Sequence, residues 1–265
     1  MKFIEKLLAA ARTNDSWLCV GLDPEPHKLP AGIDIMDFCR TVIEATQDLV
    51  CAYKPNAAFF EALGSEGWTV LQSVIKAVPN HIPVILDAKR GDIGNTAVAY
   101  ARSAFEHLGA DAVTVNPYMG YDSLEPFLDY RDRGVFVLCR TSNPGSADFQ
   151  SLELGGKPLY QMVAGKVAGW NTAGNLGLVV GATQPEELKT IRRSHPELPL
   201  LVPGVGAQGG SLELAVKYGV DTNGELAIIN SSRQIIYASP GADYDSAARQ
   251  AAQGLRDQIN RYRRE

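Results

Sequence analysis

Several residue types and patterns are scarce in this sequence of 265 residues. Basic residues do not exceed acidic ones, since 25 lysines and arginines face 30 aspartates and glutamates, for a net charge of −5. The densest basic segment, RYRRE at 261–265, is typical of a solvated helix end. Because no basic patch stands out, we expect no nucleic-acid partner. No apolar run reaches the roughly 18 residues of a membrane-spanning helix, so we expect no membrane partner either.

Motifs that hold metals or activate serine nucleophiles are also missing. The four histidines, at 27, 81, 107 and 195, are scattered and form no HExxH pair. No GxSxG motif is present. The residues therefore predict no metal site and no nucleophilic serine of that kind.

Cysteine is rare, and no CxxC motif pairs any of the four. Cys19, Cys51 and Cys139 lie in apolar, strand-like runs, where a free thiol acts as a small core residue. This usage predicts a reducing, cytoplasmic location. The first 14 residues do not read as a signal peptide, because Glu5 and Lys6 interrupt them. Their apolar spacing predicts an amphipathic helix instead.

Short apolar runs recur along the whole chain and alternate with segments of helical spacing. Most of the runs are continuously apolar, which suits strands covered on both faces. The helical segments include 57–78, 96–108, 158–170, 185–194 and 242–263. The eight strand-like runs are 17–23, 49–55, 83–89, 111–117, 134–140, 176–182, 199–205 and 226–232.

Eight βα units in about 250 residues predict an α/β fold, a (β/α)8 TIM barrel in which residues 1–265 form a single domain with an N-terminal helix. An open doubly wound sheet is the rival, but its first strand usually leads into GxGxxG, and GLDPEP (21–26) stands there. The longest stretch without periodicity, 142–158, is predicted to be a loop after the fifth strand, and loops of that length are often functional.

Polar residues gather where the predicted strands end, which is the active face of such a barrel. Asp87 and Lys89 are two apart, so on a strand both side chains point the same way. A surface salt bridge followed by a helix cap at Asn95 and Thr96 would also explain this stretch. Charged residues on neighbouring strand ends favour a functional cluster, because charges are costly to assemble at one rim. The other strand ends carry Asp23, Lys54, Thr141, Ser142, Ser231, Ser232 and Arg233.

A phosphate site is predicted after the seventh and eighth strands. PGVGAQGG (203–210) has four glycines in eight residues, and successive backbone N–H groups there could form an anion nest. Arg233 could hold a phosphate through two parallel hydrogen bonds. A plain flexible loop and a surface arginine are the alternative, but both signals fall on the two strands that build phosphate sites in these barrels.

At this point the sequence resembles a known family. DAKRGDIGNT (87–96) resembles the DxKxxDI-x-NT signature of the orotidine 5′-phosphate decarboxylase family. The resemblance spans residues 17–239, and the form of the segments is similar to the longer bacterial branch. The further matching segments, in the family's order, are CAYKPNAAFFE (51–61), SNPG (142–145), LVPGVGAQGG (201–210) and INSSRQIIYAS (229–239).

The resemblance implies a homodimeric barrel that decarboxylates orotidine 5′-monophosphate to uridine 5′-monophosphate in de novo pyrimidine biosynthesis, with no metal and no organic cofactor. By this resemblance, Lys89 donates the proton to C6 of the pyrimidine and Asp87 lies beside the substrate carboxylate. Lys54 and Asp92 complete an array of alternating charges. Asp92 and Thr96 are expected to reach the ribose in the neighbouring subunit's site.

The same resemblance assigns the remaining substrate contacts. Asp23, together with Lys54, is expected at the ribose hydroxyls. Ser142 and Gln208 are expected at the pyrimidine. The phosphate falls to Arg233 and to the backbone after Pro203, including Gly204.

Two positions depart from the commoner family pattern. Gly94 stands where many members have proline, and Gln234 follows the arginine where glycine is frequent. Neither replaces a reacting group, so they bear on loop shape only. Two other functions stay open: a Mg²⁺-dependent sugar-phosphate decarboxylase or aldolase with a similar DxKxxD, and a phosphate-binding barrel that has lost catalysis.

Overall fold

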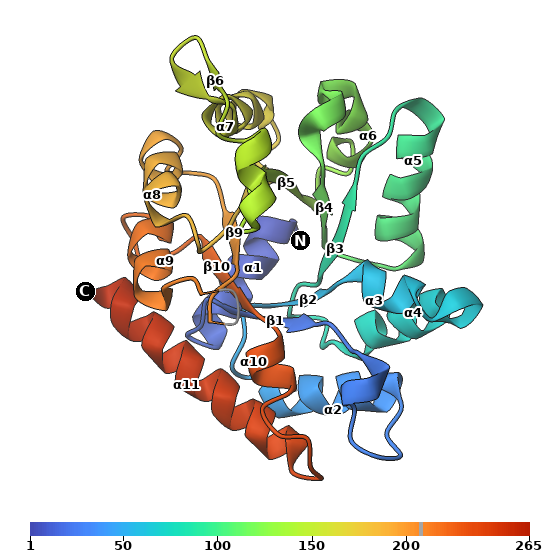
Figure 1. Cartoon of the computed structure of the whole chain (residues 1–265). Helices are drawn as coiled ribbons and strands as arrows, with labels where there is room; N and C mark the ends of the chain where they lie inside the picture. The colour runs from blue at the N-terminus through green and yellow to red at the C-terminus, as the bar shows by residue number, and fades with distance from the viewer. Residues whose placement is uncertain (207–208) are drawn as a thin grey trace.

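The computed structural model describes residues 1–206 and 209–265. In this part of the chain, eight parallel strands form one sheet in the order β2-β1-β10-β9-β8-β5-β4-β3. Parallel bridges from Tyr53 to Val84 and from Asn56 to Asp87 join β2 to β3 and bring the sheet round into a barrel (Figure 1). The barrel strands are β1 (Leu18–Leu22), β2 (Ala52–Pro55), β3 (Ile85–Arg90), β4 (Ala112–Val115), β5 (Gly134–Arg140), β8 (Leu176–Val180), β9 (Leu200–Pro203) and β10 (Ala227–Ser231).

Helices surround this barrel and cover the outer faces of the strands (Figure 1). The predicted (β/α)8 architecture is therefore confirmed: seven of the eight predicted apolar runs contain a barrel strand, and β3 extends one residue beyond the eighth, 83–89. The helices are α1 (Phe3–Thr13), α2 (Ile35–Thr46), α3 (Ala57–Glu61), α4 (Gly67–Ala77), α5 (Gly94–Arg102), α6 (Glu125–Leu128), α7 (Leu159–Trp170), α8 (Pro185–Ser194), α9 (Leu212–Gly219), α10 (Arg233–Ile236) and α11 (Tyr244–Arg264).

Most strand residues are buried on both faces of the sheet, as their apolar composition requires. All five residues of β1, β8 and β10 are buried. A parallel sheet with helices outside and packed side chains inside leaves no face for polar alternation. The core therefore runs through the barrel and outward to the helices.

The predicted helix over 57–78 is wrong in one respect, because two helices and a short 3-10 turn, η2 (Gly64–Glu66), occupy it. Gly64 has φ +75°, a conformation that ends a right-handed helix. A side chain at Gly67 would come 1.8 Å from the backbone oxygen of Phe60, so the chain turns sharply where α4 begins. Periodicity does not report this corner, because apolar spacing continues through it.

The predicted loop over 142–158 contains ordered structure. A 3-10 helix, η6 (Pro144–Asp148), is followed by an antiparallel hairpin of β6 (Glu153–Leu154) and β7 (Lys157–Pro158). Gly155 and Gly156 form its turn with φ values of +60° and +78°. Two consecutive positive φ values are what a tight two-residue hairpin needs.

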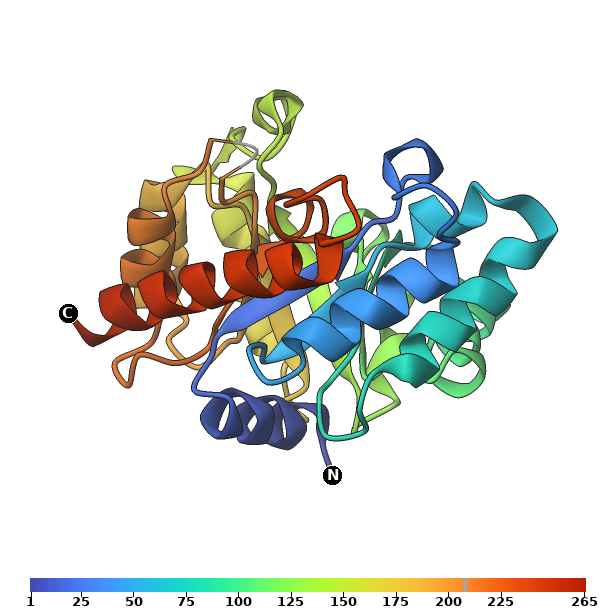
Figure 2. The same ribbon diagram turned by 90° about the horizontal axis from the view of Figure 1, so that it is seen from below.

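The predicted N-terminal helix is confirmed as α1, which lies across one end of the barrel (Figure 2). Phe3 packs edge-to-face on Phe136 of β5 with ring centroids 5.7 Å apart. Lys6 Nζ donates to Asp111 Oδ2 at 2.8 Å. The segment after β5 extends from the opposite end of the barrel, so α1 leaves that end free for the loops.

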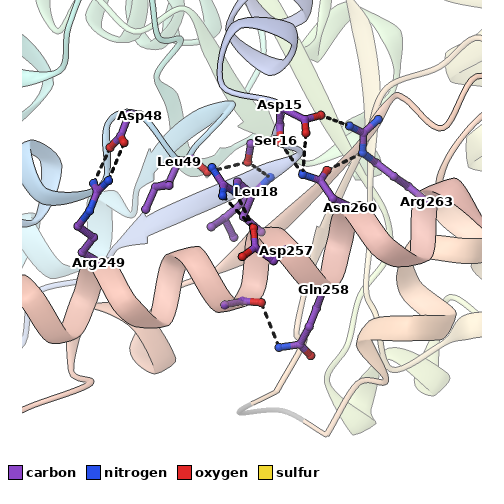
Figure 3. Close-up of polar contacts among 12 residues, drawn as sticks. Asp15, Ser16, Leu18, Asp48, Leu49, Arg249, Asp257, Gln258, Asn260 and Arg263 are labelled. Carbon is purple, nitrogen blue, oxygen red and sulfur yellow. Dashed lines mark hydrogen bonds and ion pairs between the residues drawn. The ribbon is translucent and has the colours of Figure 1, made fainter.

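The C-terminal helix α11 is fastened to the turn before β1 (Figure 3). Asn260 Nδ2 donates to the backbone oxygen of Asp15 at 2.7 Å. Arg249 binds Asp48 with two hydrogen bonds of 2.6 and 2.7 Å.

Within residues 1–206 and 209–265, no helix has the length and apolar character needed to cross a membrane.

Candidate active site

A cavity of about 530 Å³ opens where the strands carry their carboxyl ends. Its wall is built by the ends of β1 to β5 and of β8 to β10, together with the loops that follow them. This is the face on which (β/α)8 barrels carry their sites. The predicted residues that line it are Asp23, Lys54, Asp87, Lys89, Ser142, Pro203, Gly204 and Arg233.

Asp87 lies between two lysines in this cavity. Lys54 Nζ donates to Asp87 Oδ2 at 2.9 Å, and Lys89 Nζ donates to Asp87 Oδ1 at 2.6 Å. The parallel bridge from Asn56 to Asp87 sets the ends of β2 and β3 side by side and so explains the first contact. Together, Asp87 and the two lysines that it binds carry a net charge of +1.

The two lysines differ in exposure, and that difference bears on their roles. The Lys54 side chain is 5% exposed, while that of Lys89 is 48% exposed. Burial alone would lower the pKa of Lys54, but the carboxylates of Asp87 and Asp23 raise it well above its usual range. Lys54 is therefore a fixed buried cation, and Lys89 is the lysine that a ligand can reach.

Asp87 stays ionised despite its burial. Burial acts to raise its pKa, but Lys54 and then Lys89 outweigh it and lower the pKa below its usual range. A buried ion pair is weak evidence for stability, because desolvation consumes most of the attraction. Its presence at the cavity wall is therefore more readily explained by function than by folding.

The backbone at Lys89 is strained. Lys89 has φ +47°, and the pairing of β3 with β4 shifts register between Leu86 and Arg90. A non-glycine residue in this region costs of the order of 1–3 kcal/mol and persists where surrounding bonds hold it. The prediction that both side chains face the cavity holds, but a bulge delivers them rather than simple strand alternation.

Thr114 of β4 holds this bulge and was not predicted. Its hydroxyl accepts from the backbone N–H groups of Ala88 and Lys89 at 3.1 and 3.0 Å and donates to Asp87 Oδ1 at 2.9 Å. One side chain thus fixes both the strained backbone and the carboxylate. The only sequence signal was a single polar residue within an apolar strand.

Two buried oxygens in the cavity lack hydrogen-bond partners among the residues that the structure describes. They are Asp23 Oδ1 and Asn230 Oδ1, at the ends of β1 and β10. Buried acceptors in proteins are generally satisfied, so each calls for a donor such as water or a ligand hydroxyl. Asn230, like Asn56 and Gln150 of the lining, was not predicted, because an amide beside a strand end is not distinctive.

The glycine-rich loop on the predicted phosphate side has several glycines in the left-handed region. Gly204, Gly206 and Gly209 have φ values of +98°, +71° and +83°, and Gly210 N donates to the Gly204 oxygen at 3.2 Å. Arg233 is exposed, lines the cavity and begins α10. The predicted pyrimidine contact Gln208 lies outside the described residues.

The two departures from the family pattern have structural correlates. Gly94 has φ +55°, a value closed to proline, which is confined near −65°. A side chain at Gly206 would come 2.4 Å from Gln234 Oε1, so Gln234 lies directly against the glycine-rich loop. Both differences are therefore accommodated by local backbone shape.

Asp92 and Thr96 do not line this cavity, as far as the described residues show. Asp92 Oδ1 accepts from the N–H of Ile93 at 2.8 Å, and Thr96 is exposed on α5. Within one chain, the array of alternating charges that lines the cavity is therefore Asp23, Lys54, Asp87 and Lys89.

No cluster of three or more His, Cys, Asp or Glu side chains suited to a metal ion occurs in the described part of the chain.

A barrel with a charged cavity at the carboxyl ends of its strands is the arrangement typical of (β/α)8 enzymes. Residues 16–250 match the model of the orotidine 5′-phosphate decarboxylase / HUMPS family. The chain therefore belongs to that family.

Individual relatives agree with this assignment. An orotidine 5′-phosphate decarboxylase of Dehalococcoides mccartyi is 54% identical over 100% of this chain and 99% of its own. The solved OMP decarboxylase of Leishmania donovani superposes with a TM-score of 0.89 at 47% identity, covering all of both chains. UMP synthase of the same organism gives 0.92 at 50% identity, and this chain spans 57% of its length.

Proposed function

We propose that this chain decarboxylates orotidine 5′-monophosphate to uridine 5′-monophosphate, the carboxy-lyase step of pyrimidine biosynthesis, in the cytoplasm. The observation that carries the proposal is Asp87 bound by both Lys54 and Lys89 in one cavity. Full-length relatives named orotidine 5′-phosphate decarboxylase support the substrate. The four buried cysteines, three of them in or beside barrel strands, fit a reducing compartment.

The chemistry places the main demand on electrostatics. Breaking the bond from C6 to the carboxylate releases CO₂ and leaves an electron pair on C6 that the ring delocalises poorly. The Lys89 ammonium stabilises that pair and then transfers its proton to C6, giving uridine 5′-monophosphate and a neutral amine that solvent reprotonates. Lys89 suits this role because it is exposed to the cavity and is hydrogen-bonded to an ionised Asp87.

Asp87 has two functions in this proposal. It keeps Lys89 oriented, and it sets a negative charge near the position of the substrate carboxylate, which disfavours the ground state. Lys54 holds Asp87 from the buried side, with Thr114 as a second support. Asp23 is assigned to the ribose, where a sugar hydroxyl can donate to its unpaired oxygen.

The remaining contacts are assigned by the family resemblance and the cavity lining together. Ser142 faces the pyrimidine, and Arg233 with the backbone at Pro203 and Gly204 binds the phosphate. The phosphate lies far from the bond that breaks, so its binding energy can be used to organise the reacting end.

The active assembly in this proposal is a homodimer in which Asp92 and Thr96 contact the partner's ribose. Their absence from their own chain's cavity supports this. Large apolar side chains are exposed nearby, on α5 and its preceding loop and on the turns η4 (Pro117–Met119) and η5 (Tyr121–Ser123), and α5 packs against η5. These apolar side chains are Ile93 (50% exposed), Val98 (51%), Tyr118 (85%), Met119 (46%) and Tyr121 (41%).

A Mg²⁺-dependent sugar-phosphate decarboxylase or aldolase is the second candidate, because such enzymes carry a similar DxKxxD motif and the matching family model is named for HUMPS as well as for the decarboxylase. The relatives named above favour the nucleotide. A chelator separates the two, since only the sugar-phosphate enzyme should lose activity in EDTA.

The deciding experiment adds orotidine 5′-monophosphate to purified protein in EDTA and follows loss of the orotate chromophore. We expect turnover by the wild type and a fall of at least about a thousand-fold in Lys89→Ala, because the acid and the stabilising charge are both lost. Lys166→Ala, at an exposed position on α7, is the matched control and should retain full activity. A wild-type protein that does not turn over orotidine 5′-monophosphate would contradict the proposed reaction. A near-normal kcat in Lys89→Ala would show that Lys89 is not the acid.

A further inference from the structure

A buried arginine lies directly behind the wall of the cavity. Arg140 is the last residue of β5, is 4% exposed and does not itself line the cavity in the described structure. The next three residues, Thr141, Ser142 and Asn143, do line it. Arg140 is thus positioned to act on the pyrimidine side of the site without touching a ligand.

The guanidinium connects the cavity loop to a neighbouring helix. Nη1 of Arg140 donates to Ser146 Oγ at 2.6 Å and to Gln150 Oε1 at 3.4 Å. Nη2 lies 3.5 Å from Glu187 Oε1 on α8. Ser146 and Gln150 both line the cavity, whereas Glu187 belongs to the outer layer.

Further hydrogen bonds join Gln150 to Thr141, the residue that follows the end of β5. Gln150 Oε1 accepts from the N–H of Thr141 at 2.8 Å, and its Nε2 donates to Thr141 Oγ1 at 2.9 Å. The Thr141 hydroxyl donates to Asn143 Oδ1 at 2.7 Å. The start and the end of the segment 141–150 are therefore tied together, with Arg140 joined to the middle and the end.

Stability alone explains this arginine poorly. Its guanidinium is buried, its ion pair is long, and its Nε has no hydrogen-bond partner among the residues described. A buried charge so incompletely satisfied is costly. The planar fork of arginine directs separate nitrogens at Ser146 and at Glu187, a fixed geometry that an ammonium group does not impose.

We propose that Arg140 is a positioning residue that fixes the segment 141–150 as the pyrimidine-facing wall and thereby sets substrate affinity. This inference rests on the proposed function. The wall touches substrate before and during reaction, so its disorder should weaken ground-state and transition-state binding equally. Loss of Arg140 should therefore raise KM far more than it lowers kcat.

Arg192 of α8 provides the contrast. It is also buried, at 7% exposed, but donates to five backbone oxygens, those of Gly219, His195, Pro196, Leu198 and Leu226. These bonds join α8 to the β9 and β10 side and involve no residue of the cavity. Arg192→Lys is thus a matched control that disturbs a buried arginine away from the wall.

The experiment compares Arg140→Met, Arg140→Lys and Glu187→Ala with Arg192→Lys. Steady-state kinetics with orotidine 5′-monophosphate should give a KM at least about tenfold higher in Arg140→Met, with kcat within about threefold of wild type. Arg140→Lys and Glu187→Ala should show smaller rises in KM. Arg192→Lys should lose stability with KM unchanged.

Hydrogen exchange gives a readout that does not depend on turnover. Peptides covering 141–150 should exchange faster in Arg140→Met, because the bond to the Thr141 N–H weakens, while strand peptides stay protected. If Arg140→Met fails to fold, Glu187→Ala carries both measurements.

The outcomes separate the two proposals. An unchanged KM in folded Arg140 and Glu187 variants, or unchanged exchange of 141–150, overturns the positioning role. If wild-type protein does not turn over the nucleotide, the proposed function fails, and exchange alone then decides whether Arg140 holds the wall.

Discussion

At the scale of single residues, Asp87 organises the site. It accepts from Lys54, Lys89 and Thr114, so three strands meet on one carboxylate. Lys54 fixes it from the buried side, and Lys89 remains open to a ligand. The arrangement explains how an exposed lysine can be held at one place in a cavity although its own side chain is flexible.

The lowered pKa of Asp87 predicts a pH dependence of stability. In the folded state the carboxyl binds its proton less readily than in the unfolded state, so it contributes stability above pH ~4 that is lost as pH falls toward its folded pKa. Urea unfolding of wild type should show stability that falls as the pH is lowered below about 4. In Asp87→Asn the fall should be shallower, since that titration is absent.

The same variant should be less stable at pH 7. It leaves Lys54 buried beside a neutral amide, and breaking a buried pair in this way costs about 3–5 kcal/mol. Asp48→Asn is the matched control, since it breaks an exposed pair with Arg249 and should cost about 1 kcal/mol or less. Parallel pH curves for wild type and Asp87→Asn would contradict the assigned role of this carboxyl.

At the scale of elements, the sequence predicts most of the fold because strands buried on both faces have a distinctive composition. The positions of all eight strands and of the two ends of α8 could be predicted from apolar runs and from the proline and glycine residues that bound them. The break between α3 and α4 does not, because its cause is the approach of Gly67 to the oxygen of Phe60. Apolar periodicity is insensitive to such a backbone contact.

The candidate site also contains residues whose position could be predicted from the sequence and a feature that could not. Asp23, Lys54, Asp87 and Lys89 are charged residues after apolar runs, so their position at the cavity could be predicted. The bulge at Lys89 could not be, because it depends on the hydroxyl of Thr114 on the neighbouring strand. The role of a polar residue that acts through such a tertiary contact cannot be predicted from the sequence of its own segment.

The corner between α3 and α4 makes a prediction about stability. Gly67→Ala would set a methyl group 1.8 Å from a backbone oxygen, so α4 must shift and unfolding free energy should fall by about 1–3 kcal/mol. Gly165→Ala within α7 meets no atom within 4 Å and should instead gain up to about 1 kcal/mol from helix propensity. Chemical denaturation of both variants measures the difference, and equal stability would refute the packing argument.

At the scale of the whole molecule, one end of the barrel is covered by helix α1 and the other end carries the cavity. Helix α1 covers one end through Phe3, and α11 fastens the turn before β1 through Asn260. The cavity opens at the other end, among the loops. Substitutions near α1 should therefore act on stability, whereas those in the loops should act on activity.

The proposed dimer would join the loop end of one chain to that of another. Asp92, outside the described lining of its own chain's cavity, lies next to exposed Ile93. Two residues before it, the backbone oxygen of Arg90 accepts from the N–H of Asn116, which precedes the turn that carries exposed Tyr118. An apolar surface of this kind beside a charged residue suits an isologous contact between two copies, in which each chain supplies Asp92 to the other's site. Such a shared site can be tested by complementation.

Mixing Lys89→Ala with Asp92→Ala chains should restore activity that neither variant has alone. In a hybrid dimer one site loses both residues and the other keeps both. Random exchange makes half of the dimers hybrid, so we expect about a quarter of wild-type activity. Lys89→Ala mixed with Lys54→Met is the control, because Lys54 and Lys89 line the cavity of one chain and no hybrid site is intact. Subunit exchange is followed by native mass spectrometry, and exchanged hybrids without recovered activity would show that Asp92 does not serve the partner's site.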